Sequence, residues 1–242
     1  MADKQTVTTS HTDTHPVLHR AKGFWDQFSK PIIYVGSAII LLIASWYGYN
    51  KLIKAPKDQK ASELIFPAEN LFDKMASGNF TKDSVNIVLN GGELSGNKVT
   101  GLLSIIKNYG NTSAGNRANY MTGASYLQLK EFDKAIKYLK AFDGNDALQV
   151  QTRAYVMLGH AYAEQKKTSE ALEYYKKAAA VNEKDDVMSA EALMLAASYA
   201  DAIGSQKEAI ELFKKLKDKY PTSPTVSNGE VDKYLARLGE IE

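Results

Sequence analysis

The feature that most restricts the fold of this chain is a block of sequence that recurs along its second half. Its copies occupy residues 122–142, 152–181 and 196–216. Each copy carries a tyrosine and, further along, an alanine at equivalent places: Tyr126, Tyr162 and Tyr199, then Ala135, Ala171 and Ala209. The spacing indicates a repeat protein, in which one unit buries its apolar face only against its neighbours.

The middle copy predicts two short amphipathic helices joined by a polar turn. Tyr155, Leu158, Gly159 and Tyr162 recur at i, i+3, i+4 and i+7, which places them on one face of a helix. Ala171 and the residues that follow it repeat this pattern in the second helix. Gly159 and Ala171 are small where the two helix axes approach closely, and aromatic side chains fill the space beside them.

The order of these residues resembles the tetratricopeptide repeat. The middle copy carries the resemblance at these positions: Tyr155, Leu158, Gly159, Tyr162, Ala171, Tyr175 and Ala178. The resemblance implies an all-α solenoid with tetratricopeptide repeats at 114–223. Solenoids of this kind bind other proteins of many kinds, so the repeats alone do not identify a partner.

An uncharged apolar stretch near the N-terminus, at 31–50, predicts a transmembrane helix. A helix from Pro31 to Tyr49 would measure about 28 Å, close to the hydrocarbon thickness of a bilayer. Trp25 and Trp46 bracket the stretch, as residues of an interfacial belt do. A cleaved signal peptide is the rival interpretation, but no small-x-small cleavage site follows the stretch.

The remaining segments complete the predicted organisation. Residues 1–30 form a polar tail, 51–113 a degenerate helical hairpin that caps the stack, and 224–242 a C-terminal capping helix. The hairpin contains a Gly- and Asn-rich connection at 79–97. In the tail, His11, His15 and His19 are spaced so that they would lie on one side of a helix and could bind a metal ion. Pro16 lies among them and opposes such a helix.

The lysines around the apolar stretch leave its orientation open. Three basic residues precede the stretch and four follow it: Arg20, Lys22 and Lys30, then Lys51, Lys54, Lys57 and Lys60. By the positive-inside rule, this distribution gives no clear orientation and leans toward a cytoplasmic C-terminal side.

Composition excludes several classes of function. The net charge is only +2, so the chain lacks the concentrated basic character of a nucleic-acid-binding protein. Without cysteine it forms neither disulfides nor thiolate metal sites. Phosphate-binding, hydrolase, metalloprotease and dinucleotide motifs are absent from the sequence. We therefore predict no catalytic residue, cofactor or metal.

The inner face of the predicted solenoid is the candidate binding groove. It would be lined by the first helix of each repeat, at these positions: Arg117, Tyr120, Arg153, Val156, His160, Leu193 and Ala197. Arg117 and Arg153 occupy the same place in successive repeats, so they are expected side by side, either receiving a partner's carboxylate or simply solvated. The mixed apolar lining suits an extended or helical apolar segment of a partner.

The complete layout resembles the YfgM-like membrane-anchored tetratricopeptide proteins of Gram-negative bacteria, and residues 107–139 look like the Bacteroidetes branch. The resemblance implies a cytoplasmic N-terminus, an inner-membrane span and periplasmic repeats. It also implies association with the SecYEG translocon, a PpiD-like membrane chaperone and exported polypeptides, as an adaptor with a chaperone-like role.

Small residues in the span would allow close approach of translocon or partner helices: Gly36, Ser37, Ala44 and Gly48. The alternative hypothesis is a membrane-anchored receptor or assembly scaffold whose repeats face the cytoplasm. Membrane topology distinguishes the two, because only the second requires the repeats in the cytoplasm.

Overall fold

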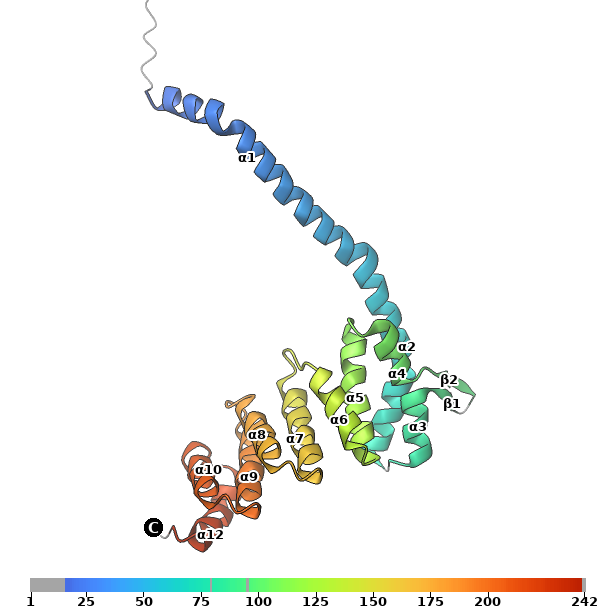
Figure 1. The fold of residues 1–242 in the computed structure, drawn as a ribbon, viewed down its shortest axis with the longest axis vertical. Coiled ribbons are helices and arrows are strands. Elements are labelled where there is room, and N and C mark those ends of the chain that lie inside the picture. Colours follow the sequence, from blue (N-terminus) through green and yellow to red (C-terminus); the bar gives the residue numbers. More distant parts are fainter. Residues whose placement is uncertain (1–15, 79, 95, 241–242) are drawn as a thin grey trace, which may run out of the picture. The chain divides into compact units, whose positions relative to one another are not determined.

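The computed structural model describes residues 16–78, 80–94 and 96–240, with side chains from residue 24 onward. The chain divides at Ala55 into two units, which we describe separately. The first contains helix α1 (Pro16–Tyr49) and the π-helical turn η1 (Asn50–Lys54). The second contains helices α2 to α12 and a short β-hairpin (Figure 1).

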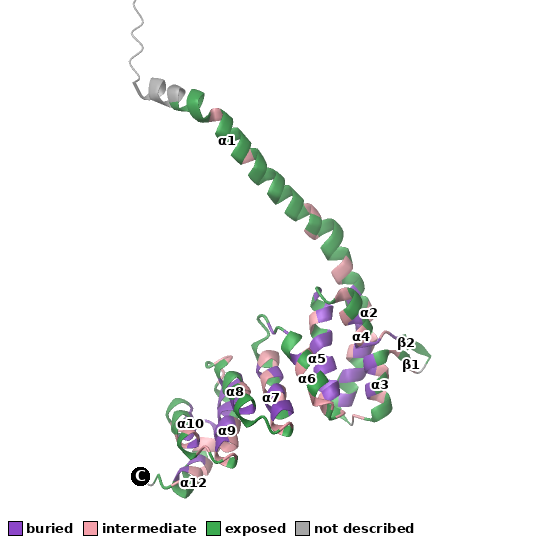
Figure 2. Cartoon of the chain, viewed as in Figure 1, coloured by how far each residue is buried: buried purple, intermediate pink, exposed green. Residues whose placement is uncertain are grey.

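Helix α1 carries the apolar stretch, and its described side chains are largely exposed (Figure 2). Within residues 24–78, the helical stretch Phe24–Ser77 is long and apolar enough to cross a membrane. Helix α1 begins at Pro16, well before the predicted end of the polar tail at residue 30. Proline is compatible with the first helical position, where the backbone N–H needs no partner. His11 and His15, and the side chain of His19, lie outside the described residues.

Six helices of the second unit form the repeats: α5 (Ser113–Gln128), α6 (Phe132–Ala141), α7 (Leu148–Glu164), α8 (Thr168–Ala180), α9 (Asp186–Ala202) and α10 (Gln206–Lys219). Figure 1 shows them following one another as antiparallel pairs. Buried residues lie mainly on the helix faces that meet neighbouring helices (Figure 2). The all-α repeat fold predicted from the sequence is confirmed.

The turn inside each repeat has the same backbone design. Lys130, Lys166 and Gly204 adopt positive φ angles of 60°, 59° and 82° just after the first helix. The next residue donates its N–H back to a carbonyl of the last turn, for example from Lys167 to the Tyr162 oxygen at 3.0 Å. This is the Schellman type of helix end, and it reverses the chain over few residues.

Close approach within the first two pairs depends on a glycine in the first helix. A Cβ atom added to Gly159 would lie 2.3 Å from a ring carbon of Tyr175. One repeat earlier, a Cβ atom on Gly123 would lie 2.5 Å from Cγ of Leu139. Glycine at these places therefore lets the partner helix insert a large side chain.

The N-terminal part of the second unit packs onto the first repeat. It consists of α2 (Ala55–Ser77), α3 (Lys82–Asn90), strands β1 (Gly92–Leu94) and β2 (Asn97–Val99), and α4 (Leu102–Tyr109). The strands pair antiparallel, with Gly92 opposite Val99. The Gly- and Asn-rich connection predicted at 79–97 is thus partly wrong, because it contains a helix. Thr81 caps α3 by accepting a hydrogen bond from the Ser84 N–H, and Val85, Val88 and Leu89 bury one face.

At the other end, α11 (Pro224–Ser227) and α12 (Glu230–Arg237) close the stack. Val231 and Leu235 of α12 are buried, and the Tyr234 ring stacks on Phe213 with centroids 4.8 Å apart. The predicted C-terminal capping helix therefore covers the apolar face that α10 would otherwise expose.

The second unit contains two hydrophobic clusters, which meet where the first and second repeats pack together. One gathers residues from α2 to α6 and Ala161 of α7, and the other gathers residues from α6 to α12. The same partly buried side chains pack against both clusters: Tyr120, Ile136 and Met157. We call this set of side chains the seam.

Candidate functional site

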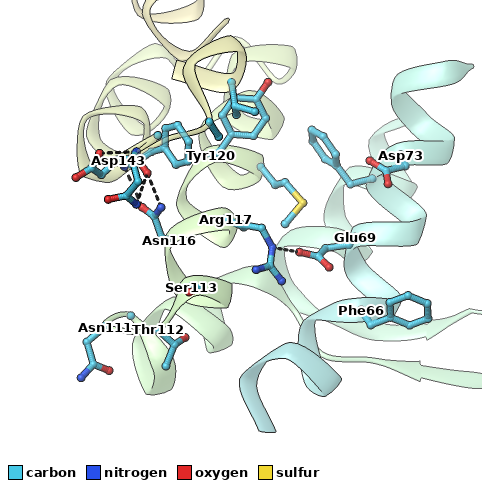
Figure 3. Close-up of a pocket in the computed structure, with 18 of the residues that line it drawn as sticks. Phe66, Glu69, Asp73, Asn111, Thr112, Ser113, Asn116, Arg117, Tyr120 and Asp143 are labelled. Carbon is cyan, nitrogen blue, oxygen red and sulfur yellow. Dashed lines mark hydrogen bonds and ion pairs between the residues drawn. The ribbon is translucent and has the colours of Figure 1, made fainter. Parts of the chain in front are cut away.

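A cavity of about 790 Å³ opens between α2, α5 and the loop that precedes α7. We call it the α2–α5 cavity. Phe66 of α2 contributes a ring that is 60% exposed, and Tyr120 and Phe142 contribute rings whose centroids are 5.3 Å apart. Figure 3 shows the Phe66 and Tyr120 side chains on opposite walls, one from α2 and the other from α5.

An ion pair joins the two walls of this cavity. Nε of Arg117 donates to Oε1 of Glu69 at 2.7 Å (Figure 3). Both side chains remain partly accessible, so we assign the pair little net stabilisation. This ion pair engages the guanidinium group of Arg117. The sequence predicted that this group and Arg153 would together bind a carboxylate of a partner.

The loop at the far side of the cavity is held by side-chain hydrogen bonds. Asn116 donates to the Asp143 carbonyl at 2.6 Å and accepts from the Asp143 N–H at 2.9 Å. The Gln151 side chain accepts from the Gly144 N–H at 2.6 Å. These contacts fix the loop on α5 and α7, so the cavity is built into the fold rather than formed by a loose segment.

A second cavity, of about 820 Å³, lies between α7 and α9 and is called here the α7–α9 cavity. Arg153, Val156 and His160 line it from α7, as predicted for the inner face of the solenoid. Val187, which is 60% exposed, lines it from α9. Together these residues form a mixed apolar and polar surface.

Tyr120 lines both cavities, which are therefore neighbours. Burial raises the pKa of its hydroxyl, and the positive charge of Arg153 opposes that rise. Arg153 is therefore close enough to act on Tyr120 electrostatically, whereas Arg117 and Arg153 line different cavities. The two arginines expected to act together therefore line separate cavities, and Tyr120 is a lining residue of both.

His160 is held at the edge of the α7–α9 cavity by the repeat core. Its Nδ1 lies 2.8 Å from the hydroxyl of Tyr175, a residue that is 2% exposed. Desolvation lowers the pKa of His160, and the nearby Glu164 charge partly offsets this effect. Burial raises the pKa of Tyr175, so the pair is neutral near pH 7 and acts as a hydrogen-bonded anchor.

Two of the groove residues predicted from the sequence are wrong. Leu193 is 2% exposed and Ala197 is 0% exposed, so both belong to the core rather than to a binding surface. Helix α9 is apolar on most of its sides and is packed between α8 and α10. Its periodicity therefore did not indicate which face points outward. The face that lines the cavity carries Val187, Met188, Glu191 and Leu195.

The contribution of α2 was not predicted from the sequence. Phe66, Glu69 and Asp73 follow one stripe of this helix at i, i+3 and i+7, and all three line the α2–α5 cavity. A signal was present, because Phe66 is a large apolar residue outside the face of α2 that contains the buried Ile65 and Ala68. An aromatic residue off the buried face is a candidate contact residue.

The predicted span contacts lie on α1, where no partner is present. A Cβ atom added at Gly36 or Gly48 would meet no atom within 4 Å. Ser37, Ala44 and Gly48 share one face of the helix at i, i+7 and i+11, while Gly36 lies about 100° away. Their role in helix contacts stays a prediction.

Comparison with known proteins supports the repeat assignment. A family model described as tetratricopeptide repeat matches residues 156–224, and another with the same description matches residues 117–143. A search of curated proteins found no match. One similar solved structure is that of the "MamA RS-1 ArsTM double mutant". It shares 18% sequence identity and has a TM-score of 0.46, with 81% of this chain and 93% of that chain covered.

Among the described residues, no group of three or more His, Asp or Glu side chains is placed to hold a metal ion. The main features of the second unit are the repeats and the two cavities. Tetratricopeptide repeats generally serve as scaffolds for protein–protein interaction. The chain therefore carries an α-solenoid of tetratricopeptide repeats preceded by one helix that is long and apolar enough to cross a membrane.

Proposed function

We propose that this protein is a membrane-tethered adaptor that holds a segment of a partner polypeptide along the α2–α5 and α7–α9 cavities, which together we call the groove. The observation that carries the proposal is the pair of neighbouring cavities that share Tyr120 as a lining residue. Their volumes, about 790 and 820 Å³, are each large enough for several side chains. A segment lying along both cavities would contact α2, α5, α7 and α9.

The apolar helix supplies the second part of the proposal. Its exposed side chains include Trp25 and Trp46, both more than half exposed, and a run of isoleucine and leucine between them. In water such a surface is unfavourable, whereas in a bilayer it is solvated by lipid. Tethering raises the local concentration of the groove near the membrane, so a modest intrinsic affinity suffices.

For the partners we propose the SecYEG translocon, a PpiD-like membrane chaperone and exported polypeptides, with the repeats in the periplasm. Support comes from the resemblance to YfgM-like proteins and from an adaptor's need to meet chains as they leave the membrane. In this arrangement the span contacts the translocon while the groove receives the emerging polypeptide in a chaperone-like role.

The test is the accessibility to protease of the second unit, which carries the repeats. It is measured in intact cells, in cells with a permeabilised outer membrane and in inverted inner-membrane vesicles. We expect digestion once the outer membrane is opened and protection in inverted vesicles. Digestion in inverted vesicles together with protection in permeabilised cells would place the repeats in the cytoplasm and contradict the export role.

That second result would favour a receptor or assembly scaffold facing the cytoplasm. The lysines after the apolar stretch are the observation behind this alternative, since Lys51, Lys54, Lys57 and Lys60 follow it closely. The groove would then hold a cytoplasmic partner, and the adaptor mechanism would otherwise be unchanged.

Adding bulk to the small residues of the span should weaken recovery of the translocon with this protein. We expect Gly36→Leu and Gly48→Leu each to reduce copurification severalfold, because leucine prevents close helix approach. Neither change clashes within the chain, since both sites have open space around them. Val35→Phe adds bulk about 160° around the helix from Ser37, and at least 100° from each of the four small residues, and is the matched control. Unchanged recovery with both glycine variants would contradict the proposed contact.

A further inference from the structure

The exposed large apolar side chains of the second unit lie at or beside the groove. Among the described residues from 56 onward they are Phe66, Leu148 and Val187. Phe66 lines the α2–α5 cavity and Val187 lines the α7–α9 cavity. Leu148 lies between Ala147, which lines the first cavity, and Gln149, which lines the second. Exposed apolar side chains at or beside both cavities favour a contact surface there.

Carboxylates outnumber guanidinium groups along the same surface. The α2–α5 cavity is lined by Glu69, Asp73 and Asp143 but by a single arginine, Arg117. The Arg117–Glu69 ion pair neutralises one of these carboxylates. Asp73 and Asp143 therefore give this cavity a negative potential, and Figure 3 shows them on opposite walls.

The α7–α9 cavity adds to this negative charge. Asp185 and Glu191 line it together with Arg153. Asp185 is partly engaged, because its carboxylate caps α9 by accepting from the Met188 N–H at 3.0 Å. The whole chain has a net charge of +2, so the groove is negative on a protein that is slightly positive. This segregation of charge gives electrostatic selectivity toward cationic ligands.

Aromatic rings line the same cavity as these carboxylates. Phe66 lies two turns from Asp73 on one stripe of α2, and Phe142 is directly followed by Asp143. A lysine or arginine side chain can place its methylene groups against such rings and its charged end on the carboxylates. An acidic segment would instead meet uncompensated negative charge.

We propose that the groove selects polypeptide segments in which aromatic or aliphatic residues are flanked by lysine or arginine. The apolar residues of the ligand would pack against Phe66, Tyr120 and Phe142, with separate cationic side chains reaching Asp73 on one wall and Asp143 on the other. This inference deepens the proposed adaptor function and depends on it, since it names the class of segment that the groove accepts.

The test uses the full-length protein in nanodiscs of zwitterionic lipid, which do not themselves attract charged peptides. Three fluorescent peptides share one apolar core and differ only in flanking residues, which are lysine, glutamine or glutamate. We expect the lysine peptide to bind about tenfold more tightly than the glutamate peptide, a preference that raised salt reduces.

Asp73→Asn combined with Asp143→Asn should remove most of the preference for lysine while leaving the affinity of the glutamine peptide unchanged. Asparagine at 143 keeps the Oδ1 atom that accepts from the Asn145 N–H, so the loop is preserved. The control is Glu211→Gln combined with Asp218→Asn on α10, which changes the net charge equally away from both cavities. Phe66→Ala should weaken all three peptides, since its exposed ring serves the apolar core of each.

The outcomes separate the two levels of the proposal. Equal affinity for the three peptides, with all of them weakened by Phe66→Ala, would overturn the charge selectivity and leave the adaptor groove standing. Failure of every peptide to bind would contradict the groove function itself. Equal effects of the groove and α10 double variants would mean that net charge alone, and not this site, sets the preference, and would also overturn the inference.

Discussion

The Gly159→Ala variant is expected to have a free energy of unfolding lower by about 1–3 kcal/mol, although alanine is the better helix former. The added Cβ would lie 2.3 Å from Cε1 and 2.5 Å from Cδ1 of Tyr175. This ring is buried in the core and edge-packed against Tyr199, with centroids 5.0 Å apart, so it has no free direction in which to move. Urea denaturation of the full-length protein in detergent, followed by circular dichroism, would measure the change.

A double-mutant cycle provides the control. Tyr175→Leu reproduces the residue found in the first repeat, where Gly123 faces Leu139. In that background, Gly159→Ala should cost less, because a leucine side chain can rotate away whereas a fixed ring cannot. If the alanine substitution costs the same in both backgrounds, the ring is not the source of the effect and our account of the helix pair is wrong.

The Phe213→Ala variant should lose about 3–5 kcal/mol of stability, the range for truncating a buried aromatic residue. Phe213 is 0% exposed and lies where α10 meets α12. Its loss would leave a cavity beneath Tyr234 and would weaken docking of the capping helix. The same denaturation experiment applies, with limited proteolysis near Glu230 reporting on α12.

Tyr234→Ala is the matched comparison for this variant. Tyr234 stacks on the same ring but is only partly buried, so its truncation should cost about 1 kcal/mol. Both variants should expose α12 to protease. A Phe213→Ala protein as stable as the wild type would mean that α12 does not close the core.

The repeats could be predicted because their determinants are local and recur. Gly159 and Tyr175 lie in one helical hairpin, and the period of the sequence already indicated that they meet. The turns were harder to predict. All three contain a residue with a positive φ angle, but only the third has glycine there, Gly204, whereas the first two have Lys130 and Lys166. A lysine in that conformation is specified by the surrounding hydrogen bonds rather than by its own preference.

The groove was predicted only in part because its walls come from distant segments. Glu69 and Arg117 are separated by 48 residues, and nothing in the repeat period indicates that α2 lies against α5. Helix α3 was missed for another reason. Its buried valines and leucine have helical spacing, but the neighbouring glycines and asparagines suggested a loop.

The seam gives the repeat unit a mechanical property. The two hydrophobic clusters leave Tyr120, Ile136 and Met157 as a partly buried contact between them. Partly buried packing opens locally more easily than a core, so we expect the stack to bend first at the seam. Because Tyr120 also lines both cavities, such bending would change the distance between them. A ligand that occupied both cavities would therefore restrain this bending, and the length of the bound segment would influence the curvature of the solenoid.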